Sequence, residues 1–244
     1  NKISAGVNTG IGAHSKKQEL GDEQFEIDDS RSLQEIYDAL LKIGLQPVMS
    51  ETFMSELPLI AVTDSATFPV RWLSNRALAK LTKLRPQAVI LRAKSLDKAA
   101  YRTLALQAQQ SCEAAGIPLI LHSDWQLASE LGKKKLHLPL ALLRQLPTCE
   151  RAHFTWLSTS VHSVEEAIEA QALGATVLIA GHIYTTQCKA GLAPRGLGFL
   201  QAVCSAVSLL VYAIGGIGFD AAQHAELQAN GARGACVMSA YMRL

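Results

Sequence analysis

Two histidines and a lysine in the middle of the chain follow apolar runs, where their side chains could do chemistry. His162 comes shortly after the run 153–159, His182 comes directly after the run 175–181, and Lys189 lies in the glycine-rich loop that follows. An imidazole titrates near neutral pH and can transfer protons, so His162 is a candidate general acid and base. The alternative is that His162 caps or packs against the helix that begins behind it.

A second group of residues has the types and spacing of an anion site. Gly215 and Gly216 end the apolar run 208–216, and Ser239 ends the next run, 232–239. Glycines let backbone N–H groups approach a phosphate, so these three residues predict a phosphate site. A tight turn that needs glycine is the alternative.

Arg92 and Lys94 alternate around Ala93 at the end of the run 87–93, so both side chains point to one side. Two cations there would bind a second anionic group, either a carboxylate or a diphosphate. Charged strand ends in contact with solvent are the alternative.

The carboxylates and the remaining histidines have weaker signals. Asp124, and similarly Asp64, follows an apolar run and serves either as a helix cap or as a ligand. His137 lies between leucines, and we expect it to pack. The spacing of His, Asp and Glu does not predict a metal cluster, and no nucleophile elbow occurs in the sequence.

The order of apolar runs and helical patterns indicates how these residues are positioned. Helical patterns separate eight short apolar runs, which is typical of a closed parallel (β/α)8 barrel; an open doubly wound sheet is the rival. In such a barrel the active site lies at the carboxyl ends of the strands. The expected strands cover 57–63, 87–93, 118–123, 134–138, 153–159, 175–181, 208–216 and 232–239. The expected helices cover 71–84, 96–115, 125–131, 140–146, a stretch from Ser163, 196–207 and 219–229.

Both ends of the chain depart from this repeat. We expect a flexible leader in residues 1–56 that contains an amphipathic helix over 31–44, and a barrel over 57–244 with a stunted last helix. The first residue is Asn1 and not Met, so the sequence leaves open whether the chain is a trimmed fragment of a longer protein.

Composition limits the class of protein. A hydrophobic content of 49% and a charged content of 18% are typical of a soluble globular protein. A formal charge of +2 gives no reason to expect nucleic acid or a membrane surface as a partner. The five cysteines are scattered, which favours reduced thiols in a cytoplasmic protein.

Seven segments in order resemble the thiamine phosphate synthase/TenI superfamily. They are LIAVTD, VILRAK, LILHSD, SVHSVEEA, GHIYTTQCKAGLAPRG, YAIGGI and GARGACVMSA. The resemblance covers roughly 57–242 and implies a (β/α)8 barrel enzyme of thiamin biosynthesis, with a small phosphorylated thiazole as its ligand.

The synthase branch joins a pyrimidine diphosphate to a thiazole phosphate with Mg²⁺ held by aspartates, and this chain departs from its pattern. Ala93 replaces a glutamate, Ser123 replaces the asparagine before Asp124, and Cys188 replaces a threonine between Thr186 and Lys189. The stretch 139–142 lacks the second metal aspartate.

The TenI-type thiazole tautomerase needs no metal, and its motifs resemble SVHSVEEA and the stretch from Gly181. This resemblance implies that His162 relocates a proton on a carboxylated thiazole phosphate, while Gly215, Gly216 and Ser239 hold the phosphate. The implied substrate-binding residues are Arg92, Lys94, Asp124, Thr186, His182 and Lys189.

We therefore expect a thiazole tautomerase without a cofactor. One alternative is a thiamine phosphate synthase that binds Mg²⁺, with Asp124 as a ligand. The other is a non-catalytic binder or regulator of the thiamin pathway. The sequence leaves open whether the chain forms a homo-oligomer.

Overall fold

The computed structural model describes residues 57–63 and 86–242, and these form a closed barrel of eight parallel strands. Each strand pairs with its neighbours in sequence, and β8 pairs with β1. The strands are β1 (Leu59–Val62), β2 (Ala88–Leu91), β3 (Leu119–His122), β4 (Lys135–Pro139), β5 (Trp156–Val161), β6 (Val177–Gly181), β7 (Leu210–Ile214) and β8 (Gly234–Val237).

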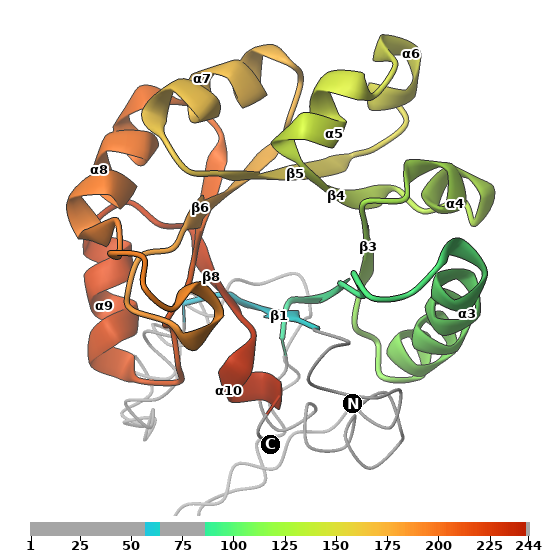
Figure 1. Cartoon of the computed structure of the whole chain (residues 1–244), viewed down its shortest axis with the longest axis horizontal. Helices are drawn as coiled ribbons and strands as arrows, with labels where there is room; N and C mark the ends of the chain where they lie inside the picture. The colour runs from blue at the N-terminus through green and yellow to red at the C-terminus, as the bar shows by residue number, and fades with distance from the viewer. Residues whose placement is uncertain (1–56, 64–85, 243–244) are drawn as a thin grey trace, which may run out of the picture. The chain divides into compact units, whose positions relative to one another are not determined.

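Helices lie around the outside of the ring of strands (Figure 1). They are α3 (Lys98–Ala114), α4 (Trp125–Glu130), α5 (Leu140–Gln145), α6 (Thr148–Arg151), α7 (Val164–Ala172), α8 (Gly196–Ala206) and α9 (Ala221–Ala229). A 3₁₀ turn, η3 (Gln187–Lys189), lies in the loop after β6, and the short helix α10 (Ser239–Met242) follows β8. None of these described helices is long and apolar enough to cross a membrane.

The expected (β/α)8 barrel is confirmed, including the short last helix. All eight strands occur. Seven of them are shorter than expected, β4 has the expected length but begins one residue later, and α6 was not expected. Strand β5 begins at Trp156 and not at 153, and the apolar Phe154 is buried in the segment that precedes the strand. The expected leader 1–56, its helix 31–44 and the helix 71–84 lie outside the described residues.

Strand residues alternate between two apolar layers, as a closed barrel requires. Ala61, Val89 and Leu178 pack with helix residues in an outer layer between strands and helices. Their neighbours along the chain form a separate inner cluster in the barrel lumen. The inner cluster contains Ile60, Val62, Ala88, Ile90, Ile120, Val177, Ile179, Tyr212 and Cys236.

The inner cluster is tightly packed around Tyr212. The Tyr212 ring meets the Trp156 ring edge-on at a centroid distance of 5.7 Å, and its hydroxyl donates to Gln87 Oε1 at 2.7 Å. Gly234 lies against the same ring: a Cβ atom there would be 2.3 Å from Tyr212 Cε1 and 2.5 Å from the Pro58 carbonyl oxygen. This position therefore has no room for a side chain.

Side-chain hydroxyls link neighbouring strands at their carboxyl ends. Thr63 Oγ1 donates to the Arg92 carbonyl at 3.0 Å and accepts from the Arg92 N–H at 2.8 Å. The Tyr101 hydroxyl donates to the Leu91 carbonyl and accepts from the His122 N–H, both at 2.9 Å. These contacts tie β1 to β2 and β2 to β3 where the strand ladder ends.

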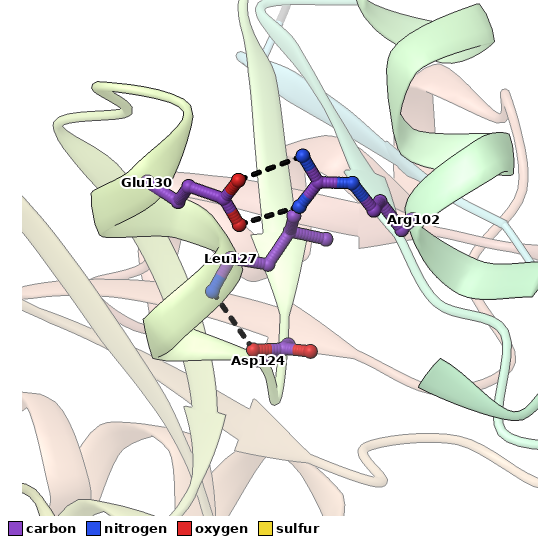
Figure 2. Close-up of polar contacts among 4 residues, drawn as sticks. All are labelled: Arg102, Asp124, Leu127 and Glu130. Atoms are coloured by element: carbon purple, nitrogen blue, oxygen red, sulfur yellow. Dashed lines mark hydrogen bonds and ion pairs between the residues drawn. The ribbon is translucent and has the colours of Figure 1, made fainter. Parts of the chain in front are cut away.

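Outside the barrel, an exposed ion pair joins α3 to α4 (Figure 2). Arg102 Nη2 lies 2.7 Å from Glu130 Oε1, and Nη1 bonds the other carboxylate oxygen. Both side chains are about half exposed, so solvent screens the pair and the barrel does not depend on it.

Substitution of two glycines by alanine should have opposite effects on stability. Gly234→Ala forces a methyl group into the Tyr212 ring and a backbone oxygen, which should cost about 1–3 kcal/mol or more. Gly198→Ala is the control: it lies in α8 with nothing within 4 Å, and alanine is the better helix former, so a gain of up to about 1 kcal/mol is expected. Denaturant unfolding measures both, and equal effects would contradict the packing described.

Tyr101→Phe should destabilise the barrel by about 1–3 kcal/mol, because it leaves the Leu91 carbonyl and the His122 N–H without their partner. The matched control is Tyr184→Phe, which removes a hydroxyl bonded to the exposed Glu226. The control should change the free energy of unfolding much less, and a comparable loss in both variants would argue against the bridge.

Candidate functional site

A cavity of about 560 Å³ opens at the carboxyl ends of the strands. Its floor is the upper part of the inner cluster, including Val62, Ile90 and Cys236. Its walls are strand ends and the loops behind them, which is where barrels of this kind place reactive groups.

The structure brings most of the predicted site residues together at this cavity. Nine of them line it: Arg92, Lys94, His162, His182, Thr186, Lys189, Gly215, Gly216 and Ser239. Asp124 is the exception. It is the N-cap of α4, where its Oδ1 accepts the Leu127 N–H at 2.9 Å (Figure 2), so the helix-cap alternative describes its geometry.

The charges around the cavity are of one sign. Arg92 and Lys94 follow β2, Lys189 lies in the loop after β6, and no aspartate or glutamate among the described residues lines the cavity. Thr63 fixes the backbone of Arg92 through its two hydrogen bonds, so the first cation leaves the barrel in a defined direction. The cavity therefore favours an anionic ligand.

A buried histidine cluster lies beside these cations. The His122 and His137 rings are 5.1 Å apart, and both line the cavity. Burial, together with the charges of Arg92 and Lys94, lowers the pKa of His122 to about 4. Burial, His122 and Arg92 hold the pKa of His137 well below its usual value. Both imidazoles are therefore neutral at neutral pH.

Hydrogen bonds determine which nitrogen of His137 carries the proton. Ser158 Oγ donates its proton to the Leu136 carbonyl at 3.2 Å, so His137 Nδ1, at 3.0 Å from the same oxygen, must be the donor. Nε2 of the neutral ring is then an acceptor, and Ser160 Oγ donates to it at 3.1 Å. Ser160 therefore presents only lone pairs to a ligand.

The expectation that His137 packs is correct for its burial, but its ring faces the lumen and not the helices. In β4, Leu136 and Leu138 belong to the outer layer, so the residue between them points inward. This alternation is the sequence signal that could have identified His137 as a cavity residue.

His162 is held by two contacts. Its Nδ1 lies 2.8 Å from the Gly181 carbonyl and must donate to it, which leaves Nε2 as the nitrogen without a proton in the neutral ring. Its backbone N–H donates to Glu166 Oε2 at 2.6 Å. Ser163 caps α7 by accepting the Glu166 N–H at 3.1 Å. The SVHSVEEA segment therefore joins β5 to β6 and starts α7.

The glycine pair has a backbone conformation that suits both the predicted phosphate site and its alternative, a tight turn. Gly215 and Gly216 have φ values of 103° and 71°, which favour glycine. A Cβ atom at Gly215 would lie 2.3 Å from His182 Cβ, and one at Gly216 would lie 2.5 Å from the Thr185 carbonyl. Strands β7 and β8 are paired, so this pair and Ser239 leave the barrel side by side.

The residues present do not fit the Mg²⁺ ion that the synthase resemblance implies. Among the described residues no group of three His, Cys, Asp or Glu side chains could hold a metal ion. Asp124 Oδ1 caps α4, and β4 ends in Pro139 at the cavity, followed by a buried Leu140. Asp64 lies outside the described residues. We therefore derive no step through the metal.

The position before Asp124 explains one departure in the sequence. Ser123 has a φ of 69°, a left-handed conformation that asparagine adopts more readily than most residues. The asparagine implied by the resemblance suits this backbone, and Ser123 occupies it with its Oγ 2.6 Å from His122 Nδ1.

Comparison with known proteins finds similarity between this chain and thiamine-phosphate synthases. The family described as thiamine monophosphate synthase matches residues 59–241. A thiamine-phosphate synthase of Listeria monocytogenes serotype 4a is 35% identical over 156 residues, which cover 61% of this chain and 71% of that enzyme. A thiamine-phosphate synthase of Syntrophomonas wolfei is 29% identical over 194 residues, covering 77% of this chain and 90% of that enzyme.

A solved structure agrees on the fold. Thiamine phosphate pyrophosphorylase from Pyrococcus furiosus superposes with a TM-score of 0.63 at 23% identity, covering 77% of this chain and 88% of that one. At this identity the likeness supports the barrel and not the activity.

The expectation of a thiazole tautomerase is wrong, because the relatives at 29–35% identity are thiamine-phosphate synthases. The motifs that favoured the tautomerase have structural roles: Ser163 and Glu166 start a helix, and His162 joins two strands. Such roles serve the barrel whatever reaction it catalyses. The resemblance to the superfamily is confirmed, and the chain belongs to the thiamine monophosphate synthase family.

Proposed function

We propose that this chain is a transferase that joins a pyrimidine diphosphate to a thiazole phosphate, forming thiamine phosphate and releasing pyrophosphate. The relatives named thiamine-phosphate synthase support this reaction. The observation that carries the proposal is a single cavity with groups suited to anions at two places, the cations after β2 and the glycine pair after β7. Two phosphorylated substrates need two such places.

The diphosphate belongs at the end formed by Arg92 and Lys94. Negative charge develops on the leaving diphosphate as its bond to the pyrimidine-bearing carbon breaks. Cations that are already in place stabilise this charge in the transition state without reorganising. Arg92 is well suited to the role, because Thr63 holds its backbone and a guanidinium can bind two phosphate oxygens.

The thiazole phosphate belongs at the end formed by Gly215, Gly216 and Ser239. The loop after β6 lies between the two ends in strand order and contributes Thr186, Lys189 and the buried His182. Fixing one substrate by its phosphate brings its ring to the reacting carbon, which is catalysis by positioning.

The centre of the cavity supplies hydrogen-bond acceptors. The hydrogen bonds of Ser160 and His162 leave a hydroxyl oxygen and an imidazole nitrogen available for ligand N–H or O–H groups. The proton relocation that the sequence suggested for His162 belonged to the tautomerase and is not proposed here.

A turnover assay tests the function. The full chain is mixed with pyrimidine diphosphate, thiazole phosphate and Mg²⁺, and both pyrophosphate and thiamine phosphate are measured. We expect both products in equal amounts, and no pyrophosphate when thiazole phosphate is omitted. Binding of thiazole phosphate in calorimetry without any turnover would instead identify a non-catalytic binder and refute the proposal.

Ser239→Ala should raise the KM for thiazole phosphate about tenfold with a smaller change in kcat, because it removes a hydroxyl from the phosphate end. Ser205→Ala, on the exposed outer face of α8, is the matched control and should leave both constants unchanged. If Ser239→Ala altered only the KM for pyrimidine diphosphate, the two ends would be assigned the wrong way round.

A further inference from the structure

The described residues that line the cavity include none of the carboxylates that usually anchor a divalent cation to a protein. Mg²⁺ prefers oxygen ligands and is usually held by one or two carboxylates together with substrate phosphates. In the part of the chain that the structure describes, Arg92, Lys94 and Lys189 line the cavity, and no carboxylate does.

The groups closest to the expected metal position already have other partners. The Asp124 carboxylate accepts the Leu127 N–H, and the end of β4 offers a proline ring and a buried leucine. Both ring nitrogens of His137 are bonded to serine hydroxyls, and Nδ1 of His122 is bonded to Ser123. Asp124 Oδ1 and both nitrogens of His137 are therefore engaged within the protein, and Asp124 is not among the residues that line the cavity.

We propose that the diphosphate end of the cavity binds its ligand through Arg92 and Lys94 without a divalent cation. This inference rests on the proposed function for the identity of the ligand. The side-chain cations supply the positive charge that a carboxylate-bound metal supplies elsewhere. A metal ion entering this cavity would meet like charges and, among the residues that the structure describes, no carboxylate to offset them.

The sign of the magnesium effect follows from this arrangement. When carboxylates hold the metal, Mg²⁺ bridges protein and diphosphate and tightens binding. When only cations bind the diphosphate, Mg²⁺ competes with them for the same oxygens and lowers the negative charge of the ligand. Binding of pyrophosphate should therefore be as tight without Mg²⁺ as with it, or tighter.

Calorimetric titration of the full chain with inorganic pyrophosphate, in excess EDTA and in excess Mg²⁺, tests the inference. We expect a dissociation constant in EDTA that is equal to or lower than the constant in Mg²⁺. Binding about tenfold tighter in Mg²⁺, or binding that occurs only in Mg²⁺, would overturn the proposal. Absence of binding under both conditions would overturn it as well.

Variants of two exposed lysines show which end of the cavity binds the pyrophosphate. Lys94→Gln should weaken binding about tenfold in EDTA, because it removes a charged hydrogen-bond donor from the cavity. Lys98→Gln, at the start of α3 and not among the residues that line the cavity, is the matched control and should bind as the parent does. Equal binding by Lys94→Gln and the parent would refute the assignment to this end.

The titration and the turnover assay test the inference and the proposed function separately. Metal-independent pyrophosphate binding without thiamine phosphate formation would refute the proposed function and leave the anion site in place. Turnover combined with strictly magnesium-dependent pyrophosphate binding would refute the inference and leave the function in place.

Discussion

Peptide groups at the carboxyl ends of the strands impose the constraint on which this site depends. A closed parallel barrel pairs its backbone groups along the ladder, but beyond the last rung each buried N–H and carbonyl needs another partner. Thr63 and Tyr101 supply partners between the first three strands, and His162 supplies one between β5 and β6. The Arg195 guanidinium also donates to the Gly181 carbonyl, at 3.2 Å. The rim of the cavity is therefore held by side chains as much as by the sheet.

Residues at the rim that bond backbone groups can resemble catalytic residues in the sequence, and this explains why short motifs led to the wrong functional prediction. A histidine that leaves a strand before a capped helix has the sequence appearance of a proton donor. In the structure the first task of His162 is to bond a carbonyl of the neighbouring strand. Any enzyme with this barrel can have such a residue, so the motif around it indicates the fold and not the reaction. Identity over most of the barrel to thiamine-phosphate synthases is the better guide to the reaction.

The barrel and most of the residues that line its cavity were predictable from the sequence, but the exact strand ends and some contacts between strands were not. Apolar runs mark buried strands, and the carboxyl-end rule then assembles Arg92, Lys94, Gly215 and Ser239 from three separate runs. The ends of the strands were less predictable, because a buried apolar residue can lie outside a strand. Phe154 is such a residue, and it made the expected start of β5 earlier than the observed one. The Tyr101 bridge was not predictable, because it depends on a backbone N–H 21 residues away in sequence.

The inner cluster around Tyr212 determines how ligands can enter and leave the cavity. Tyr212 is buried in the lumen, with Gly234 closed against its ring, so ligands cannot pass through the amino end of the barrel. Substrates and products must then share the opening at the carboxyl end. For the proposed reaction, two substrates and two products would all pass through this one opening, so a ligand bound at the mouth of the cavity would block the exchange of a ligand bound below it.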